Sequence, residues 1–119
     1  MPELRFAFVT LDCQDLDAVG AFWAALLEGS LGDPMDDGRF VFLRDRDDIP
    51  TFCLQRVTET KAAKNRMHLD FEVDDLEATT ARIVELGGSW PGGEQVLERY
   101  RWRTVQDPEG NEFDITVVE

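Results

Sequence analysis

Hydrophobic and polar residues follow the same order twice along this chain. Residues 5–13 alternate between apolar and polar side chains, as in a half-buried strand, and residues 66–73 do the same. Each run is followed by apolar residues at helical spacing, which are Leu16, Val19, Phe22, Trp23, Leu26 and Leu27 in the first half and Leu76, Ile83 and Leu86 in the second. We therefore predict a strand followed by a helix in each half of the chain.

Polar and glycine residues mark the ends of both predicted helices. Asp15 precedes the first helix and Asp74 or Asp75 precedes the second, where a carboxylate accepts hydrogen bonds from first-turn amides. Gly29 is predicted to end the first helix, and the pair at 87–88 the second.

Short strand-like runs follow each helix. They cover residues 39–45 and 51–57 in the first half, and 100–106 and 112–118 in the second. The sequence Asp107-Pro-Glu-Gly-Asn111 separates the last two runs and is typical of a turn. A strand, a helix and then further strands, in both halves, predict an α+β fold.

The two halves are also similar residue by residue, at an offset of 60. Five residues are identical between the copies, namely Asp15, Leu16, Ala18, Ala21 and Leu26 against Asp75, Leu76, Ala78, Ala81 and Leu86. Two copies of this length are too few and too long for a solenoid. We therefore predict one domain, residues 1–119, built from two modules covering 1–60 and 61–119.

Alternation along each strand predicts which side chains share a face. In the last strand, Phe113, Ile115 and Val117 form the apolar face, presented to a helix, and Glu112, Asp114 and Thr116 point away from it. The faces away from the helices also receive large aromatic side chains, Phe8, Phe42 and Trp102. Because aromatic side chains are poorly placed in open water, these faces are expected to line a concave binding cup.

Charge and cysteine content exclude several classes of protein. The 119 residues carry a formal net charge of −13, which argues against binding to nucleic acid or to an anionic membrane. No apolar run is long enough to span a membrane and no signal peptide pattern is present. Cys13 and Cys53 are too few for a disulfide framework, so we expect reduced thiols and a cytoplasmic protein.

Histidine is scarce, because His68 is the single histidine of the chain. This excludes metal sites that need two or three histidines, including the His-x-x-x-His zinc motifs. A lone histidine beside carboxylates is either a hydrogen-bonded cavity residue or one ligand of a mixed site. Asp70 and Glu72, on the same strand, are interpreted as solvent-facing or helix-edge charges.

Two motifs, together with the repeat, resemble a known family. The segments His68-Leu-Asp-Phe-Glu-Val-Asp-Asp75 and Asp107-Pro-Glu-Gly-Asn-Glu-Phe-Asp114 are similar to those of the vicinal oxygen chelate superfamily. That superfamily includes glyoxalase I, bleomycin-resistance proteins, fosfomycin-resistance transferases and extradiol dioxygenases, and the resemblance is greatest to the small glyoxalase-like domains. It implies two βαβββ modules that form an incomplete barrel around a ligand cup.

The resemblance also implies where metal ligands would lie. Metal-dependent members carry ligands on the opening and closing strands of each module, and these positions correspond here to Phe8, Gln55, His68 and Asp114. Phe8 departs from the pattern, since a phenyl ring cannot ligate a cation. The remaining set of Gln55, His68 and Asp114 suits Zn²⁺, Ni²⁺, Mn²⁺, Fe²⁺ or Co²⁺, with Glu112 as a further ligand or as a catalytic general base.

Two functions follow from the same cup. The first is a metal-dependent lyase or isomerase of the glyoxalase-like kind, acting on a small metabolite. The alternative is a metal-free protein of the bleomycin-resistance type, which sequesters a small molecule and which the phenylalanine at position 8 favours. In both cases the expected ligand-binding residues are Phe8, Thr10, Phe42, Cys53 and Trp102, and the resemblance is compatible with a homodimer.

Overall fold

The computed structural model describes residues 2–47 and 50–119 and divides the chain into two compact units, Met1–Glu59 and Thr60–Glu119. Each unit consists of a strand, a helix and three further strands. Within the described residues, no helix is long and apolar enough to cross a membrane.

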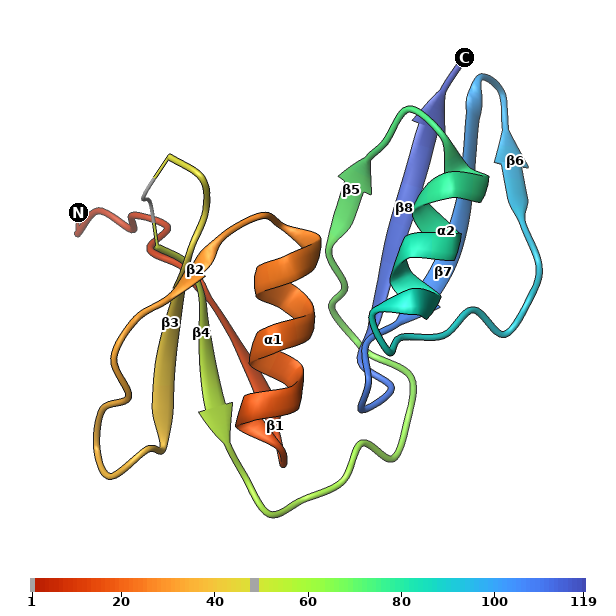
Figure 1. The fold of residues 1–119 in the computed structure, drawn as a ribbon. Coiled ribbons are helices and arrows are strands. Elements are labelled where there is room, and N and C mark those ends of the chain that lie inside the picture. The colour runs from red at the N-terminus through yellow and green to blue at the C-terminus, as the bar shows by residue number, and fades with distance from the viewer. Residues whose placement is uncertain (1, 48–49) are drawn as a thin grey trace. The chain divides into compact units, whose positions relative to one another are not determined.

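The first unit is a four-stranded sheet with one helix against it (Figure 1). Its strands are arranged in the order β1-β4-β3-β2, with β1 parallel to β4 and the other neighbours antiparallel. The elements are β1 (Val9–Cys13), α1 (Leu16–Leu26), β2 (Ser30–Leu31), β3 (Phe40–Arg44) and β4 (Pro50–Arg56).

The second unit repeats this topology, with strand order β5-β8-β7-β6 and β5 parallel to β8. Its elements are β5 (Asp70–Glu72), α2 (Leu76–Glu85), β6 (Gln95–Leu97), β7 (Tyr100–Gln106) and β8 (Glu112–Val118). Both sheets are open, and the mixed α+β fold predicted from the sequence is confirmed.

The core of each unit lies between its helix and its sheet. Apolar side chains from one stripe of each helix are removed from water against alternate residues of the strands, which is the main favourable contribution to folding. The buried apolar residues include Val19, Phe22, Trp23, Leu43, Phe52 and Leu54 in the first unit and Leu76, Ile83, Val105, Phe113 and Ile115 in the second.

The predicted helix caps are present at equivalent places in the two units. The Asp15 side chain accepts a hydrogen bond of 3.1 Å from the backbone N–H of Ala18, and Asp75 accepts one of 3.0 Å from Ala78. Of the two alternatives for the second helix, Asp75 is therefore the cap.

Gly29 has a different role from the predicted helix stop. Helix α1 ends at Leu26, and the left-handed residue after it is Glu28, with φ of 54°. A Cβ atom on Gly29 would lie 2.2 Å from the backbone oxygen of Arg44. Glycine is therefore required because the chain passes so close to the backbone at the end of β3.

The strands differ from the prediction mainly at the N-terminal ends of the two modules. Residues 5–8 and 66–69 lie outside β1 and β5, and Phe6 and Met67 are exposed. The predicted alternation therefore extends beyond the strand in both copies. The short strands β2 and β6 were missed because exposed residues of two or three positions carry no periodic signal.

Candidate functional site in the second unit

Strand register in the second unit places polar side chains in one row across the sheet. Asp114 on β8 is aligned with Asp70 on β5 and with Thr104 on β7. Paired residues of neighbouring strands point to the same side of a sheet. This side is the one away from α2, because the alternate residues Phe113 and Ile115 are buried in the core.

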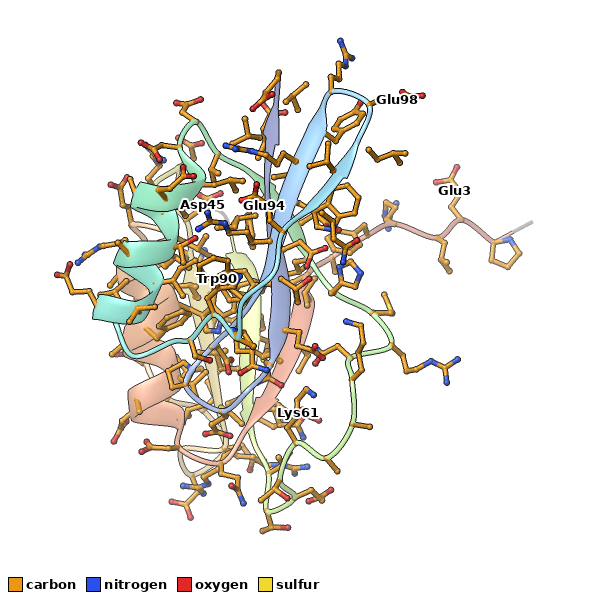
Figure 2. The ribbon with its side chains drawn as sticks, turned by 90° about the vertical axis from the view of Figure 1, so that its right-hand side faces the viewer. Glu3, Asp45, Lys61, Trp90, Glu94 and Glu98 are labelled. Carbon is orange, nitrogen blue, oxygen red and sulfur yellow. The ribbon has the colours of Figure 1, made fainter. Side chains whose placement is uncertain are left out.

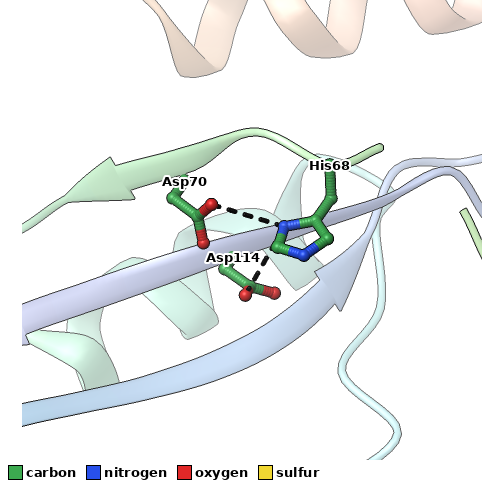
Figure 3. A group of neighbouring side chains, drawn as sticks. All are labelled: His68, Asp70 and Asp114. Carbon is green, nitrogen blue, oxygen red and sulfur yellow. Dashed lines mark ion pairs between the residues drawn. The ribbon is translucent and has the colours of Figure 1, made fainter. Parts of the chain in front are cut away.

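His68 joins this row from the segment that precedes β5. Its Nδ1 atom lies 3.4 Å from Oδ2 of Asp70 and 3.7 Å from Oδ2 of Asp114 (Figure 3). The Asp114 side chain is only 8% exposed, and its Oδ1 accepts a hydrogen bond of 2.7 Å from the Thr104 hydroxyl. One ligand atom from each of His68, Asp70 and Asp114 can be chosen so that all lie within 4.8 Å of one another.

The two carboxylates of this cluster affect each other. Partial burial raises the pKa of Asp70, and the neighbouring Asp114 carboxylate raises it further through a hydrogen bond and through charge repulsion, whereas His68 opposes the change. A positive charge placed between the two carboxylates would relieve this repulsion. The donor set of one imidazole and two carboxylates therefore fits a divalent first-row cation.

A hollow of about 490 Å³ lies over this cluster. The aromatic side chains of Tyr100 and Trp102 provide apolar surface, and Lys64 is the basic residue among those that line it. The other lining residues are His68, Asp70, Gln95, Leu97, Thr104, Asp114 and Thr116. Its size and mixture of apolar and polar groups are typical of a site for a small organic molecule.

Asp70 is the residue of this site that the sequence interpretation undervalued. Its side chain is 54% exposed, as a solvent-facing charge would be, but it also lies within ion-pair distance of His68. The missed signal was the pairing of the opening and closing strands. Parallel register between the strands carrying Asp70 and Asp114 brings the two carboxylates together.

In the first unit, the structure brings together four of the five predicted ligand-binding residues on one face of the sheet, whereas Trp102 belongs to the second unit. Cys53 of β4 is aligned with Thr10 of β1 and with Phe42 of β3. Phe8 contacts Phe42 edge to face, with ring centroids 4.9 Å apart. Gln55 follows Cys53 by two positions in β4 and therefore shares its face.

The electrostatic surroundings of Cys53 do not favour a role as a nucleophile. Burial raises the pKa of its thiol, and a hydrogen bond with Thr10 only partly offsets that effect. The thiolate is the nucleophilic form, so a raised pKa keeps this side chain unreactive. Both Cys13 and Cys53 are buried, and neither forms a disulfide.

Glu112 makes a different set of contacts from those expected of a general base. Its carboxylate accepts a hydrogen bond of 2.8 Å from the backbone N–H of Asn65 and lies 3.4 Å from the Nζ atoms of Lys61 and Lys64. Its own backbone N–H donates to the Asn65 side chain at 3.2 Å. Through these contacts, Glu112 connects the segment that precedes His68 to the start of β8.

These contacts hold the pKa of Glu112 below its usual range, and the hydrogen bond from Asn65 has the largest effect. Burial raises the pKa by a smaller amount, and the charges of Lys64 and Lys61 lower it further. A carboxylate with a lowered pKa is a weaker proton acceptor. The geometry therefore favours a structural role for Glu112.

We expect Glu112→Gln to lower the free energy of unfolding by about 1 kcal/mol at pH 7, since a neutral amide loses charge-assisted bonds. A carboxylate whose pKa is lower in the folded state contributes stability above its unfolded pKa, and loses it as pH falls through the folded value. The difference between wild type and variant should therefore shrink below about pH 4. Urea unfolding at pH 7 and pH 3 measures this, and an unchanged difference at both would contradict it.

Comparison with known proteins assigns the chain to a family. Residues 8–116 match the sequence profile of the glyoxalase-like domain, so the chain belongs to the glyoxalase-like domain family. This confirms the resemblance to the vicinal oxygen chelate superfamily that the two motifs indicated. No curated protein sequence matches the chain significantly.

Solved structures with the same fold include a glyoxalase/bleomycin resistance protein/dioxygenase family enzyme from Burkholderia phytofirmans PsJN. It is 18% identical, with 95% of this chain and 98% of that chain covered and a TM-score of 0.74. The fosfomycin resistance protein FosX from Listeria monocytogenes is 16% identical, with 99% and 96% covered and a TM-score of 0.77.

A variant of the Listeria protein was crystallised with Mn(II) and 1S,2S-dihydroxypropylphosphonic acid. It is 16% identical, with 93% of this chain and 87% of that chain covered and a TM-score of 0.75. At these identities, the likeness establishes the fold.

Proposed function

We propose that this protein binds a small metabolite in the hollow of the second unit and acts on it as a metal-dependent lyase or isomerase. The observation that carries the proposal is the cluster of His68 and Asp114 beside Trp102 on the lining of that hollow. The Mn(II) complex of the Listeria FosX variant supports it as an analogy of fold.

In this proposal His68 and Asp114 hold a divalent cation, and Gln55 is the donor that the resemblance assigns to the first unit. Such a cation, when bound, acts as a Lewis acid that stabilises negative charge developing on two neighbouring substrate oxygens. Thr104 keeps the Asp114 carboxylate oriented through its 2.7 Å hydrogen bond, as hydrogen-bonded partners of metal ligands generally do. Trp102 and Tyr100 offer apolar surface for the rest of the substrate.

The second candidate function is metal-free binding of a small molecule. Phe8 stands where metal-dependent relatives carry a ligand, and it packs edge to face on Phe42. Phe8, Phe42, Thr10 and Cys53 would then bind the apolar part of a ligand. An acidic protein suits a cationic ligand, so a screen against cationic glycopeptides is the direct assay for this alternative.

The proposal also includes a homodimer in the cytoplasm. Each sheet has two end strands that pair with one neighbour within their own unit, and end strands of this kind can pair with another chain. Buried cysteines that form no disulfide are typical of proteins in a reducing compartment.

Metal titration separates the two functions. We expect protein purified without a metal-affinity tag and treated with chelator to bind Mn²⁺, Ni²⁺ or Zn²⁺ with one-to-one stoichiometry in calorimetry. His68→Ala should weaken this binding by about 100-fold, since it removes the single imidazole donor. Glu85→Gln, which removes an exposed carboxylate from α2, serves as the control and should bind as wild type does. Absence of stoichiometric binding to the wild type would refute the metal-dependent function.

A further inference from the structure

We propose that Asp70 is a third protein ligand of the cation, so that the second unit alone supplies an imidazole and two carboxylates. This inference rests on the proposed function and adds a ligand position that lies two residues after His68 on the opening strand of the unit. It concerns the residue that the sequence interpretation had treated as a solvent-facing charge.

The backbone fixes where Asp70 lies. Asp70 and Asp114 are aligned in the parallel pair of β5 and β8, and the backbone N–H of Asp114 donates to the carbonyl of Leu69 at 2.8 Å. The two carboxylates therefore emerge from neighbouring strands at the same level of the sheet. His68 immediately precedes this point, so its ring is brought to the same place by the chain itself.

The distances from the His68 ring nitrogen to the two carboxylates are close to those between ligands of one bound cation. Ligand atoms at about 2.0–2.2 Å from a first-row divalent cation lie roughly 3–3.6 Å from each other when they occupy adjacent coordination positions. Nδ1 of His68 lies 3.4 Å from Oδ2 of Asp70 and 3.7 Å from Oδ2 of Asp114 (Figure 3). Small side-chain adjustments would bring the three donors onto one cation.

Charge and access are also suitable. Two carboxylates balance the two positive charges of the cation, and the imidazole binds in its neutral form. The cluster lines the hollow, which leaves the remaining coordination positions facing the space for a small molecule. Asp70 is the more exposed carboxylate, and Asp114 is the buried one anchored by Thr104.

The chain offers a matched control for this proposal. Glu72 lies two residues after Asp70 in β5, and is exposed on the same side of the sheet, but belongs to no cluster of metal-ligating side chains among residues 2–47 and 50–119. Asp70→Asn and Glu72→Gln each remove one negative charge from the same strand. A general electrostatic effect would weaken cation binding in both variants without changing the Co²⁺ spectrum, whereas loss of a ligand changes the spectrum in the first variant alone.

The experiment measures Mn²⁺ binding by calorimetry and by electron paramagnetic resonance of free Mn(II), together with the visible absorption spectrum of the Co²⁺-loaded protein. We expect Asp70→Asn to weaken Mn²⁺ binding at least tenfold and to change the Co²⁺ spectrum at saturation, with Glu72→Gln like wild type. Asp70→Glu, which keeps the charge but moves the oxygen atoms, should also change the spectrum. Circular dichroism checks that each variant is folded.

The outcomes distinguish this inference from the proposed function. If wild type binds no cation, both fail. If His68→Ala abolishes binding but Asp70→Asn binds Mn²⁺ like wild type with an unchanged Co²⁺ spectrum, the proposed function stands and Asp70 is not a ligand. Equal weakening in Asp70→Asn and Glu72→Gln, without a spectral change, also overturns the inference.

Discussion

Replacing Arg103 with methionine is expected to lower the free energy of unfolding by about 3 kcal/mol, because a largely buried guanidinium loses three hydrogen bonds and its stacking on an aromatic ring. The Arg103 side chain is only 10% exposed although it is charged. Its Nε donates to Glu94 at 2.9 Å, its Nη1 to the Thr80 hydroxyl at 3.0 Å, and its Nη2 to Glu77 at 3.3 Å. Its guanidinium also lies 4.0 Å from the centre of the Trp90 ring.

These contacts explain the size of the expected effect. Thr80 and Glu77 belong to α2, whereas Trp90 and Glu94 belong to the segment that returns to the sheet, as Figure 2 shows for the latter two. Arg103 therefore connects three parts of the second unit through strand β7. Methionine keeps the volume of the aliphatic stem but loses the hydrogen bonds and the stacking on Trp90.

Arg101→Met is the matched control, since Arg101 lies on the same strand and the same face. Its side chain is 32% exposed, and its contacts are longer, at 3.5 Å to Glu94 and 3.6 Å to Glu119. A half-exposed ion pair contributes about 1 kcal/mol or less. Urea unfolding followed by circular dichroism compares the two variants. Equal destabilisation would show that the contacts of Arg103 contribute no more to stability than those of Arg101.

The buried arginine also shows where sequence interpretation stops. In the run 100–106, alternation places Trp102 on the face away from the helix, and therefore Arg101, Arg103 and Val105 on the face toward it. The pattern does not identify the partners that a charged side chain needs there. Charged residues are normally placed toward water. Only the folded structure shows that Glu77, Thr80 and Glu94 converge on Arg103 and make its burial possible.

Features that depend on neighbouring residues in the sequence were predicted well. The helix stripes and the aspartate caps depend on residues within one turn, so Asp15 was found directly and Asp75 was one of the two expected caps. Strands β7 and β8 were predicted with the bounds they have, because each is bordered by clear turn residues. The family followed from two motifs on a repeat and is confirmed by the sequence profile match.

Contacts between strands that are far apart in the sequence were harder to predict. His68 and Asp114 were connected through the resemblance, whereas Asp70 joined them only once the parallel register of β5 and β8 was known. Glu112 was grouped with Asp114 because the two share a face. Its actual partners, Lys61, Lys64 and Asn65, lie in a segment without periodicity, from which no pairing could be predicted.

Replacing a tryptophan by alanine at two places tests whether one side of the sheets is the packed core and the other a binding face. Trp23→Ala is expected to lower the free energy of unfolding by about 4 kcal/mol, because it leaves a cavity in the core of the first unit. Trp23 is 2% exposed, and its ring meets Phe22 and Phe52 edge to face, at centroid distances of 5.4 Å and 5.1 Å. These contacts to helix and sheet leave the surroundings little freedom to collapse.

Trp102→Ala removes the same side chain from β7, on the face that lines the hollow. No closed cavity forms there, so the expected loss is about 1 kcal/mol. Urea unfolding gives both values, and tryptophan fluorescence of Trp23→Ala reports the remaining residues Trp90 and Trp102. If Trp102→Ala proved as destabilising as Trp23→Ala, Trp102 would be a core residue and the hollow would lose its main aromatic surface.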